Sequence, residues 1–340
     1  MRFVEVSPGA VHLRSGERPR PGRGEACVDV SACGICGTDV HLLHGMVMPP
    51  GASYPVRPGH EVAGIVSELG EGVTSLSVGD AVALHPLSPC GRCVACTSGA
   101  EQRCDDARIL GIHAAGGMAD QLVWPADRMV KTGDIPMEQA ALLPDAVATA
   151  WHALARAQVP PGGTLVVLGA GGVGTHVLQL AVAADPTVTT AAVVRSDASA
   201  ERLEALGIGT VIRGLEGSAR QLRASISGAD AVIDFSGAPA APAEGVRALR
   251  RGGVLVLGSV VDEALDLRTT TTTVVTRETR IVGSYSSTVD DLRAVTELTA
   301  SGALDLSDSA SVQLPLSEAE DAFKLLEERP PGLVRAVLRP

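Results

Sequence analysis

The chain has 340 residues, a formal net charge of −11 and 45% hydrophobic residues. This hydrophobic content supports a large core and excludes a disordered chain, and the length suggests two domains. The acidic balance argues against sequence-independent nucleic-acid binding, which requires a basic face. The first residues lack the apolar stretch of a signal peptide, and no apolar run reaches the about 18 residues that a membrane span needs. We therefore expect a cytoplasmic protein with neither nucleic-acid nor membrane partners.

Residues 1 to about 145 have the pattern of a compact, mostly β domain. Short β-type runs such as 26–31 and 62–67 alternate with glycine-containing turns such as 69–73 and 78–82. Short runs bounded by turn residues are typical of strands, so we expect a β domain here.

Four of the seven cysteines form a cluster with metal-ligand spacing. The spacing is C-x2-C-x2-C-x7-C, and the residues are Cys90, Cys93, Cys96 and Cys104. Clustered cysteines in a cytosolic protein are more often metal sites than disulfide frameworks. Four thiolates match the closed tetrahedral site of structural zinc, which leaves no open position for chemistry. Free thiols and an iron–sulfur cluster are the alternatives.

A second group of potential ligands lies upstream of this cluster. It contains a thiol, a hydroxyl, acids and histidines, namely Cys36, Thr38, Asp39, His41, His60 and Glu61. A catalytic zinc needs about three protein ligands and an open position, and Cys36 and His60 can supply two of the three. Taken alone, each of these two would more often be a buried cysteine or a core histidine.

The second half of the chain has the alternating pattern of an α/β domain. After a helical, alanine-rich stretch at 145–152, we expect buried strands at 164–168, 192–194, 231–235 and 254–257. The helical stretches between these strands indicate a parallel sheet.

Near the C-terminus we expect two helices and a strand, at 289–301, 317–328 and 333–338. Asp290 and Asp291 are typical of a helix N-terminus. The threonine run at 269–273 has no explanation at the level of the sequence.

A glycine-rich loop follows the first of these strands and opens the predicted helix 175–184. Its residues are Gly169, Ala170, Gly171, Gly172, Val173 and Gly174. Between a strand and a helix, this G-x-G-x-x-G pattern indicates a dinucleotide site. The first glycine permits the tight turn, the second lets a pyrophosphate approach the backbone, and the third lets the helix pack against the strand.

The residues after the second strand indicate whether the site prefers NAD or NADP. An NAD site carries an acid about 20 residues beyond the glycine loop, where it binds the ribose 2′-hydroxyl. Here Arg195 and Ser196 occupy this region, and an arginine suits the 2′-phosphate of NADP. Asp197 leaves NAD as the alternative. We expect NADP to be preferred.

Together and in this order, these motifs resemble those of a zinc-dependent medium-chain alcohol dehydrogenase, over essentially the whole chain. The motifs are Gly-Ile-Cys-Gly-Thr-Asp-Val-His, Gly-His-Glu, the four cysteines and Gly-Ala-Gly-Gly-Val-Gly. The resemblance implies an α/β protein with a GroES-like β domain at 1–147 that carries both zinc sites. It also implies a Rossmann domain with a doubly wound parallel sheet at 148–286 and a return of 287–340 to the first domain. The active site would lie in the cleft between the domains.

The resemblance implies a role for each matching residue of the metal site. Cys36 and His60 match two catalytic-zinc ligands, and Asp145 matches the third, where many members have cysteine. A carboxylate in place of a thiolate makes a harder site that holds its ion more weakly. Glu61 matches an acid behind the metal that can bind zinc when the open position changes. Asp39 matches the acid that orients the histidine ligand.

The remaining matches concern proton transfer, substrate and cofactor. Thr38 would pass on the proton of the alcohol, and His41 resembles the solvent-side end of the relay, which suits the pKa of histidine. His85 lies where family members place substrate-pocket residues, so it is either a pocket wall or a surface residue. Arg335 resembles the late arginine near the cofactor pyrophosphate. Further candidate cofactor contacts are Thr149, Gly258 and Ser259.

The function that follows is the zinc-dependent interconversion of an alcohol and an aldehyde or ketone, with hydride transfer to or from NAD(P). We expect two zinc ions per subunit, a small-molecule substrate and a homodimer or homotetramer. Two alternatives on the same fold are an NADPH-dependent reductase of an activated C=C bond and a non-catalytic sensor of zinc and nucleotide. The retained ligand and relay residues argue against both, whereas Asp145 leaves some room for the reductase.

Overall fold

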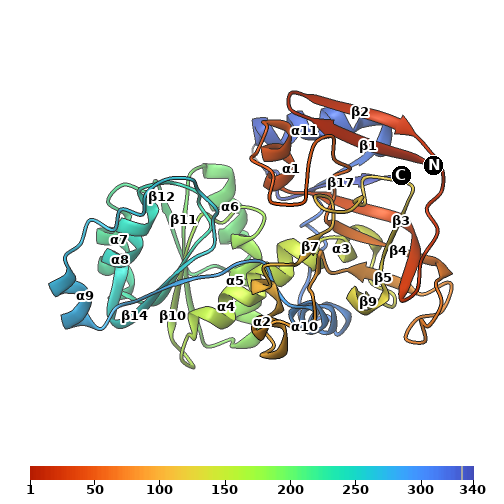
Figure 1. The fold of residues 1–340 in the computed structure, drawn as a ribbon. Helices are drawn as coiled ribbons and strands as arrows, with labels where there is room; N and C mark the ends of the chain where they lie inside the picture. Colours follow the sequence, from red (N-terminus) through yellow and green to blue (C-terminus); the bar gives the residue numbers. More distant parts are fainter. Residues whose placement is uncertain (331) are drawn as a thin grey trace. The chain divides into compact units, whose positions relative to one another are not determined.

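The computed structural model describes residues 1–330 and 332–340, and the chain divides into two compact units (Figure 1). The first unit joins Met1–Ala148 to Ser287–Pro340, and the second is Thr149–Ser286. Each unit has its own sheet and its own apolar core. Among the helices of the described residues, none is both long and apolar enough to cross a membrane.

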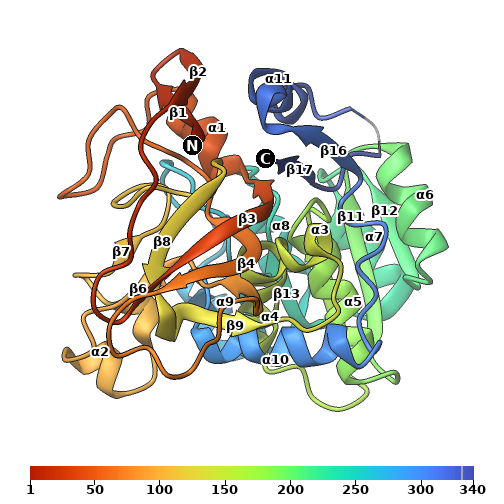
Figure 2. The same ribbon diagram turned by 90° about the vertical axis from the view of Figure 1, so that its right-hand side faces the viewer.

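Strand β3 (Glu25–Ile35) is the centre of the first unit. It pairs along one edge with β4 (Glu61–Leu69) and along the other with β8 (Gln121–Pro125) and β17 (Ala336–Arg339), all antiparallel. Figure 2 shows β17, in dark blue from the end of the chain, near β3, in red from its beginning. The C-terminal segment is therefore part of the sheet that the N-terminal residues build.

The core of the first unit also draws on both parts of the chain. Trp124 and Phe323 are its largest fully buried side chains, and Phe323 belongs to α11 (Ala319–Glu328). Both lie in one apolar cluster with residues of β3, β4 and β17. Because burial of this cluster drives folding, the segment after residue 287 is needed to complete the unit.

The other elements of the first unit either extend this sheet or pack around it. In the described residues they are β1 (Arg2–Ser7), β2 (Ala10–Ser15), α1 (Gly37–Leu43), β5 (Ala81–Leu84), β6 (Leu87–Ser88), α2 (Val94–Thr97), η1 (Glu101–Arg103), β7 (Arg108–Ile109), η2 (Ala126–Arg128), β9 (Met129–Lys131), α3 (Met137–Ala140), η3 (Leu143–Val147), α10 (Val289–Ala300), β16 (Val312–Pro315) and η4 (Leu316–Glu318). The strand order along the sheet is β16-β17-β3-β4-β5-β9.

A parallel sheet with helices on both faces forms the second unit. Its elements are α4 (Ala148–Ala157), β10 (Thr164–Leu168), α5 (Gly174–Ala184), β11 (Thr189–Val194), α6 (Asp197–Ala205), β12 (Thr210–Arg213), α7 (Ser218–Ile226), β13 (Ala229–Asp234), α8 (Ala241–Ala248), β14 (Leu249–Leu257), α9 (Thr271–Arg277) and β15 (Arg280–Gly283). The strand order β12-β11-β10-β13-β14-β15 is the doubly wound order of a Rossmann fold. In Figure 1, α7 and α8 cover one face, and α4 and α5 the other. The apolar run of β10 is fully buried, as a sheet covered on both faces requires.

The C-terminal elements agree with the sequence except at the last strand. The helix N-terminus expected at 290–291 is confirmed, since Thr288 and Asp291 form a capping box at the start of α10. The strand predicted at 333–338 is wrong at its start, because β17 begins at Ala336. The amide of Leu333 instead donates to the carbonyl of Pro330 at 3.2 Å.

The threonine run at 269–273 marks the beginning of a helix. Thr270 is the N-cap of α9, and its hydroxyl accepts a hydrogen bond from the amide of Thr273 at 3.1 Å. Threonine is a common N-cap residue, so this signal was present in the sequence. It was missed because α9 has no buried residue and therefore no apolar periodicity.

Helix α7 is capped by a side chain from α8. Its own N-cap residue, Gly217, has no side chain that could accept a hydrogen bond. The Glu244 carboxylate accepts instead from the amide of Ala219 at 3.0 Å and from the hydroxyl of Ser218 at 3.4 Å. Glu244 is 11% exposed and also pairs at 2.8 Å with Arg247, which is 46% exposed. This carboxylate therefore links α7 to α8.

Replacing Glu244 with alanine leaves the Ala219 amide without its acceptor. We expect the free energy of unfolding of the second unit to fall by about 1–3 kcal/mol. Arg247→Ala removes only the more exposed partner and should cost less than about 1 kcal/mol. Urea titrations followed by circular dichroism compare the two variants, and equal losses would contradict the capping role.

Candidate active site

Three side chains with metal-ligand atoms converge in the first unit. Cys36 is the N-cap of α1, His60 directly precedes β4, and Asp145 lies in η3, a single π-helical turn. Their ligand atoms all lie within 4.8 Å of one another, and His60 Nε2 is 3.6 Å from Asp145 Oδ2. Tetrahedral nitrogen and oxygen ligands of zinc lie about 3.4 Å apart, so this donor set fits a zinc ion with one open position. π-Helical turns are rare and are frequent at functional sites.

A buried acid lies behind the histidine of this group. Asp39 Oδ1 is 3.8 Å from His60 Nδ1, and Asp39 Oδ2 accepts the amide hydrogen of Cys36 at 2.9 Å. Burial lowers the pKa of His60, but the carboxylates of Asp39 and Asp145 outweigh it and hold that pKa well above its usual value. This arrangement directs Nε2 of His60 toward Asp145, as expected for a histidine oriented by a second acid.

A buried ion pair lies beside the three potential ligands. Arg335 Nη2 is 3.2 Å from Glu61 Oε1, and Arg335 Nη1 donates to the carbonyl of Ile35 at 3.4 Å. Burial raises the pKa of Glu61 to about 8, although Arg335 opposes the rise. Gly34 makes room for this carboxylate, because a Cβ atom at Gly34 would lie 2.1 Å from Glu61 Oε2.

The two residues expected to transfer protons both lie on α1. Thr38 Oγ1 is 3.9 Å from Cys36 Sγ, and its side chain is half-buried. His41 is exposed, one helical turn beyond Thr38. Thr38 therefore lies beside the three potential ligands, and His41 faces solvent.

The four cysteines form a second potential metal centre in the same unit. All of them are free thiols, and their sulfur atoms lie within 4.8 Å of one another. Sulfur ligands at about 2.3 Å from zinc lie about 3.8 Å apart, and the Cys90–Cys96 and Cys93–Cys96 separations are 3.9 and 3.4 Å. The amides of Arg92 and Cys93 lower the pKa of Cys90 to about 6, which favours its thiolate. The set fits a closed zinc site.

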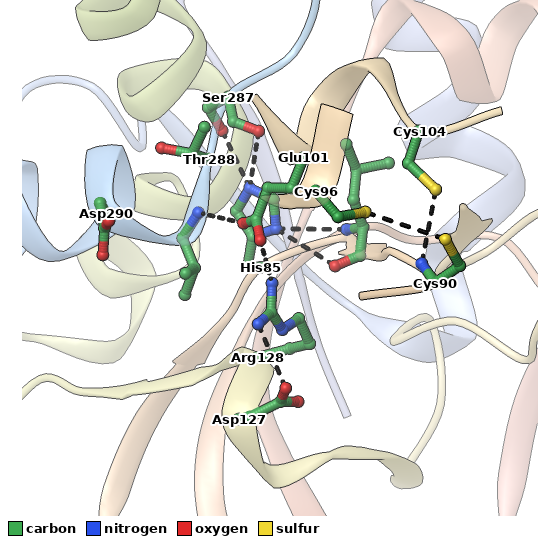
Figure 3. A network of polar contacts seen from close by, with 12 residues as sticks. His85, Cys90, Cys96, Glu101, Cys104, Asp127, Arg128, Ser287, Thr288 and Asp290 are labelled. Atoms are coloured by element: carbon green, nitrogen blue, oxygen red, sulfur yellow. Dashed lines mark hydrogen bonds and ion pairs between the residues drawn. The ribbon is translucent and has the colours of Figure 1, made fainter. Parts of the chain in front are cut away.

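A polar network connects the loop of the four cysteines to the start of α10 (Figure 3). Glu101, in η1 between Cys96 and Cys104, accepts from the Val289 amide at 2.9 Å. Its other oxygen accepts from Arg128 Nη1 at 2.8 Å. Sequence reasoning missed Glu101; the one available signal was an acid within the cysteine cluster.

Both interpretations of His85 are wrong, because its side chain is fully buried and bonded within the first unit. His85 Nε2 lies 3.1 Å from the carbonyl oxygen and 3.2 Å from the hydroxyl of Ser287. His85 Nδ1 accepts the amide hydrogen of Leu87 at 3.3 Å. The ring is therefore neither a pocket wall nor a surface group, but a second attachment for the segment that precedes α10.

The glycine-rich loop connects β10 to α5 in the second unit. Gly169 has φ +82°, and a Cβ atom there would lie 2.4 Å from the Cα of Ser236. A Cβ atom at Gly174 would lie 2.3 Å from the Gly169 carbonyl oxygen, so α5 packs closely against the loop. Around Gly171 the same position is open, which leaves room for a ligand. Gly172 and Val173 complete the loop before the N-terminus of α5, where phosphate groups bind favourably.

The residues after β11 carry the features expected of the 2′ site. Arg195 is exposed, and Ser196 caps α6 by accepting from the Ser199 amide. Asp197, the residue that would favour NAD, pairs with Arg213 Nε at 2.9 Å. Its side chain is 82% exposed, so this is a surface ion pair with an arginine of β12.

The other expected cofactor residues are spread over both units. In the second unit, Gly258 packs against the ring of Phe235, and Ser259 Oγ accepts from the Gly237 amide at 3.1 Å. Thr149 is the first residue of that unit and is buried. Arg335 belongs to the first unit, where its guanidinium faces Glu61.

Arg202, in α6, contacts the glycine loop, and the sequence did not reveal this contact. Its Nη2 donates to the carbonyl of Ala170 at 3.1 Å and to the Thr175 hydroxyl at 3.0 Å. It stabilises the loop from α6, which follows the loop in the chain after α5 and β11. No local pattern marks such a contact, because its partners precede it by 32 and 27 residues.

Comparison with known proteins places the whole chain in one family. Residues 22–136 match the family model of the alcohol dehydrogenase GroES-like domain, and residues 172–301 match that of the zinc-binding dehydrogenase. An alcohol dehydrogenase of Geobacillus stearothermophilus is 32% identical over 323 residues, which are 94% of each chain. The L-galactonate-5-dehydrogenase of Escherichia coli K12 is 32% identical over 93% of this chain and 92% of its own.

A solved structure agrees with these relatives. A putative zinc-binding dehydrogenase from Sinorhizobium meliloti, bound to NADP, has a TM-score of 0.88 at 29% identity and covers 100% of this chain and 99% of its own. The chain belongs to the zinc-binding medium-chain dehydrogenase family. It is a nicotinamide-dependent oxidoreductase of the alcohol dehydrogenase type, with the predicted GroES-like and Rossmann folds.

The stability of the first unit should depend on pH through His85. Burial lowers the pKa of His85 below its unfolded value of about 6.5. The unfolded chain then binds the proton more readily, so stability should fall as the pH drops below about 6.5, by at most about 1.4 kcal/mol per pH unit. Urea unfolding between about pH 5 and 8 measures this slope. His85→Gln should have a smaller slope, and identical slopes would contradict the assignment.

Proposed function

We propose that this enzyme binds two zinc ions per subunit, prefers NADP, and uses Cys36, His60 and Asp145 to hold the catalytic ion. In this proposal the first unit carries both metals and the second unit carries the cofactor. The observation that carries the proposal is the convergence of a thiol, an imidazole and a carboxylate within 4.8 Å. An ion held there would act as a Lewis acid on the substrate oxygen.

The side chains around this position have separate tasks in hydride transfer. Asp39 orients His60 and stabilises its position through the 3.8 Å contact with Nδ1. Thr38 relays the proton of the substrate hydroxyl when the alcohol is oxidised: its oxygen accepts that proton as its own hydroxyl proton passes on, and the direction reverses when the carbonyl is reduced. His41, exposed on the same helix, exchanges that proton with solvent.

The region after β11 supports NADP as the preferred cofactor. Arg195 presents an exposed guanidinium at the end of the strand, where a 2′-phosphate would accept charge-assisted hydrogen bonds. Asp197, the acid that would bind a ribose hydroxyl, lies two residues further on and forms a surface ion pair with Arg213.

Zinc content tests the metal sites directly. Wild-type protein, purified without chelators, should contain about two zinc ions per subunit by elemental analysis, and Cys36→Ser about one. Correct folding of the variant is checked by circular dichroism. About one zinc in both proteins would mean that the Cys36 site holds no zinc, and would favour the reductase of an activated C=C bond.

Cofactor titrations test the role of Arg195. Arg195→Ala removes the donor for the 2′-phosphate, so the Kd for NADPH should rise by about 10- to 100-fold. The Kd for NADH should change by less than about threefold, because NADH lacks that phosphate. Fluorescence titrations with both cofactors measure the ratio. Equal weakening of both would show that Arg195 does not read the phosphate.

A further inference from the structure

Glu101 connects the loop of the four cysteines to helix α10. Its carboxylate, 16% exposed, lies between Cys96 and Cys104 in sequence, so a metal bound by the four thiolates would fix its position. One oxygen accepts from the Val289 amide at 2.9 Å, and the other from Arg128 at 2.8 Å. Figure 3 shows Glu101 between the cysteines and the start of α10.

The Val289 amide is the first amide of α10, and such amides have no acceptor within their own helix. Thr288 caps the amide of Asp291, which leaves the Val289 amide to Glu101. A carboxylate at a helix N-terminus also interacts favourably with the helix dipole. The segment before α10 is held as well, since the carbonyl and hydroxyl of Ser287 lie within hydrogen-bond distance of His85 Nε2. The start of α10 is thus attached at two places, to Glu101 within the cysteine loop and to His85 before that loop.

Helix α10 packs in turn against η3, the turn that carries Asp145. The buried face of α10 includes Val289, Leu292 and Val295. η3 supplies the third potential ligand beside Cys36 and His60. A continuous series of contacts therefore leads from the four cysteines through Glu101 and α10 to Asp145, all within the first unit.

We propose that Glu101 is a positioning residue, which couples metal binding at the four cysteines to the placement of Asp145 in the catalytic metal site. The four-cysteine site then serves the catalytic ion as well as its own loop. A carboxylate ligand makes the catalytic site the weaker holder of its ion, so its affinity is sensitive to where η3 lies. The last step, from η3 to Asp145 as a ligand, rests on the proposed metal site.

The sharpest variant is Val289→Pro, because it deletes the amide hydrogen that Glu101 accepts. Proline is tolerated at the first position of a helix, and Thr288 has the extended backbone that precedes proline favourably. Val289→Ala is the matched control, since it loses the same buried side chain but keeps the amide. Glu101→Ala is the second variant, should the proline variant not fold. Asp290→Asn, 84% exposed and paired only with Arg293 among the described ion pairs, controls for charge at the helix start.

Two readouts test the proposal without relying on activity. Hydrogen exchange by mass spectrometry should be about tenfold faster at 287–292 in Val289→Pro than in Val289→Ala, and faster also at 143–147. Zinc release to a chromogenic chelator from the Cys36 site is identified as the kinetic phase that is missing in Cys36→Ser. This phase should be about two- to thirtyfold faster in Val289→Pro than in Val289→Ala. Glu101→Ala should show increases at least as large as those of Val289→Pro, because it also removes the acceptor of Arg128, and Asp290→Asn should match wild type.

Two results would overturn the coupling. The same exchange in Val289→Pro and Val289→Ala at 287–292 would show that Glu101 does not anchor α10. Faster exchange at 287–292, with exchange at 143–147 and zinc release unchanged, would show that the hydrogen bond from Val289 to Glu101 does not affect η3. If wild type holds only one zinc, the proposed catalytic site fails independently, and exchange at 143–147 still decides whether α10 controls η3.

Discussion

The antiparallel register of β3 with β4 is the constraint on which the first unit depends. It pairs Gly34 with Glu61, so that Cys36, just after β3, meets His60, just before Glu61. Strand β17 pairs with the same end of β3 along its other edge and brings Arg335 to Glu61. A slip of one residue would turn Glu61 to the opposite face of the sheet and separate this group. Gly34 protects the register locally, since any side chain there would collide with the Glu61 carboxylate.

This register buries several ionisable side chains together. The carboxyl groups are Asp39, Glu61 and Asp145, and the basic groups facing them are His60 and Arg335. Burying a carboxylate is costly unless a cation accompanies it, and burial accordingly raises the pKa of Glu61 to about 8, although Arg335 opposes the rise. The buried carboxyl groups therefore depend on the two basic side chains that the same register brings to them.

The sequence was informative where the physical requirement for particular residue types lies within one short segment. The glycine loop could be located from the sequence because turn, phosphate approach and helix packing each require glycine at a fixed spacing. In the structure, a side chain at Gly169 or Gly174 would collide with its neighbours. The cysteine spacing predicted a four-thiolate cluster for the same kind of reason. The π-helical turn around Asp145 could not be predicted, since no residue pattern distinguishes it from an α-helix and packing against α10 and β4 accompanies it.

The sequence by itself determined the family, the fold class and which residue types are available to bind metal and dinucleotide, because these follow from motifs a few residues long. Only the tertiary structure decided the burial of His85, the capping of α7 by Glu244 and the hydrogen bond from the Val289 amide to Glu101. The last of these joins residues 188 positions apart. Such pairs are fixed by how sheets and helices pack, and packing depends on the whole core, which no local stretch of sequence encodes.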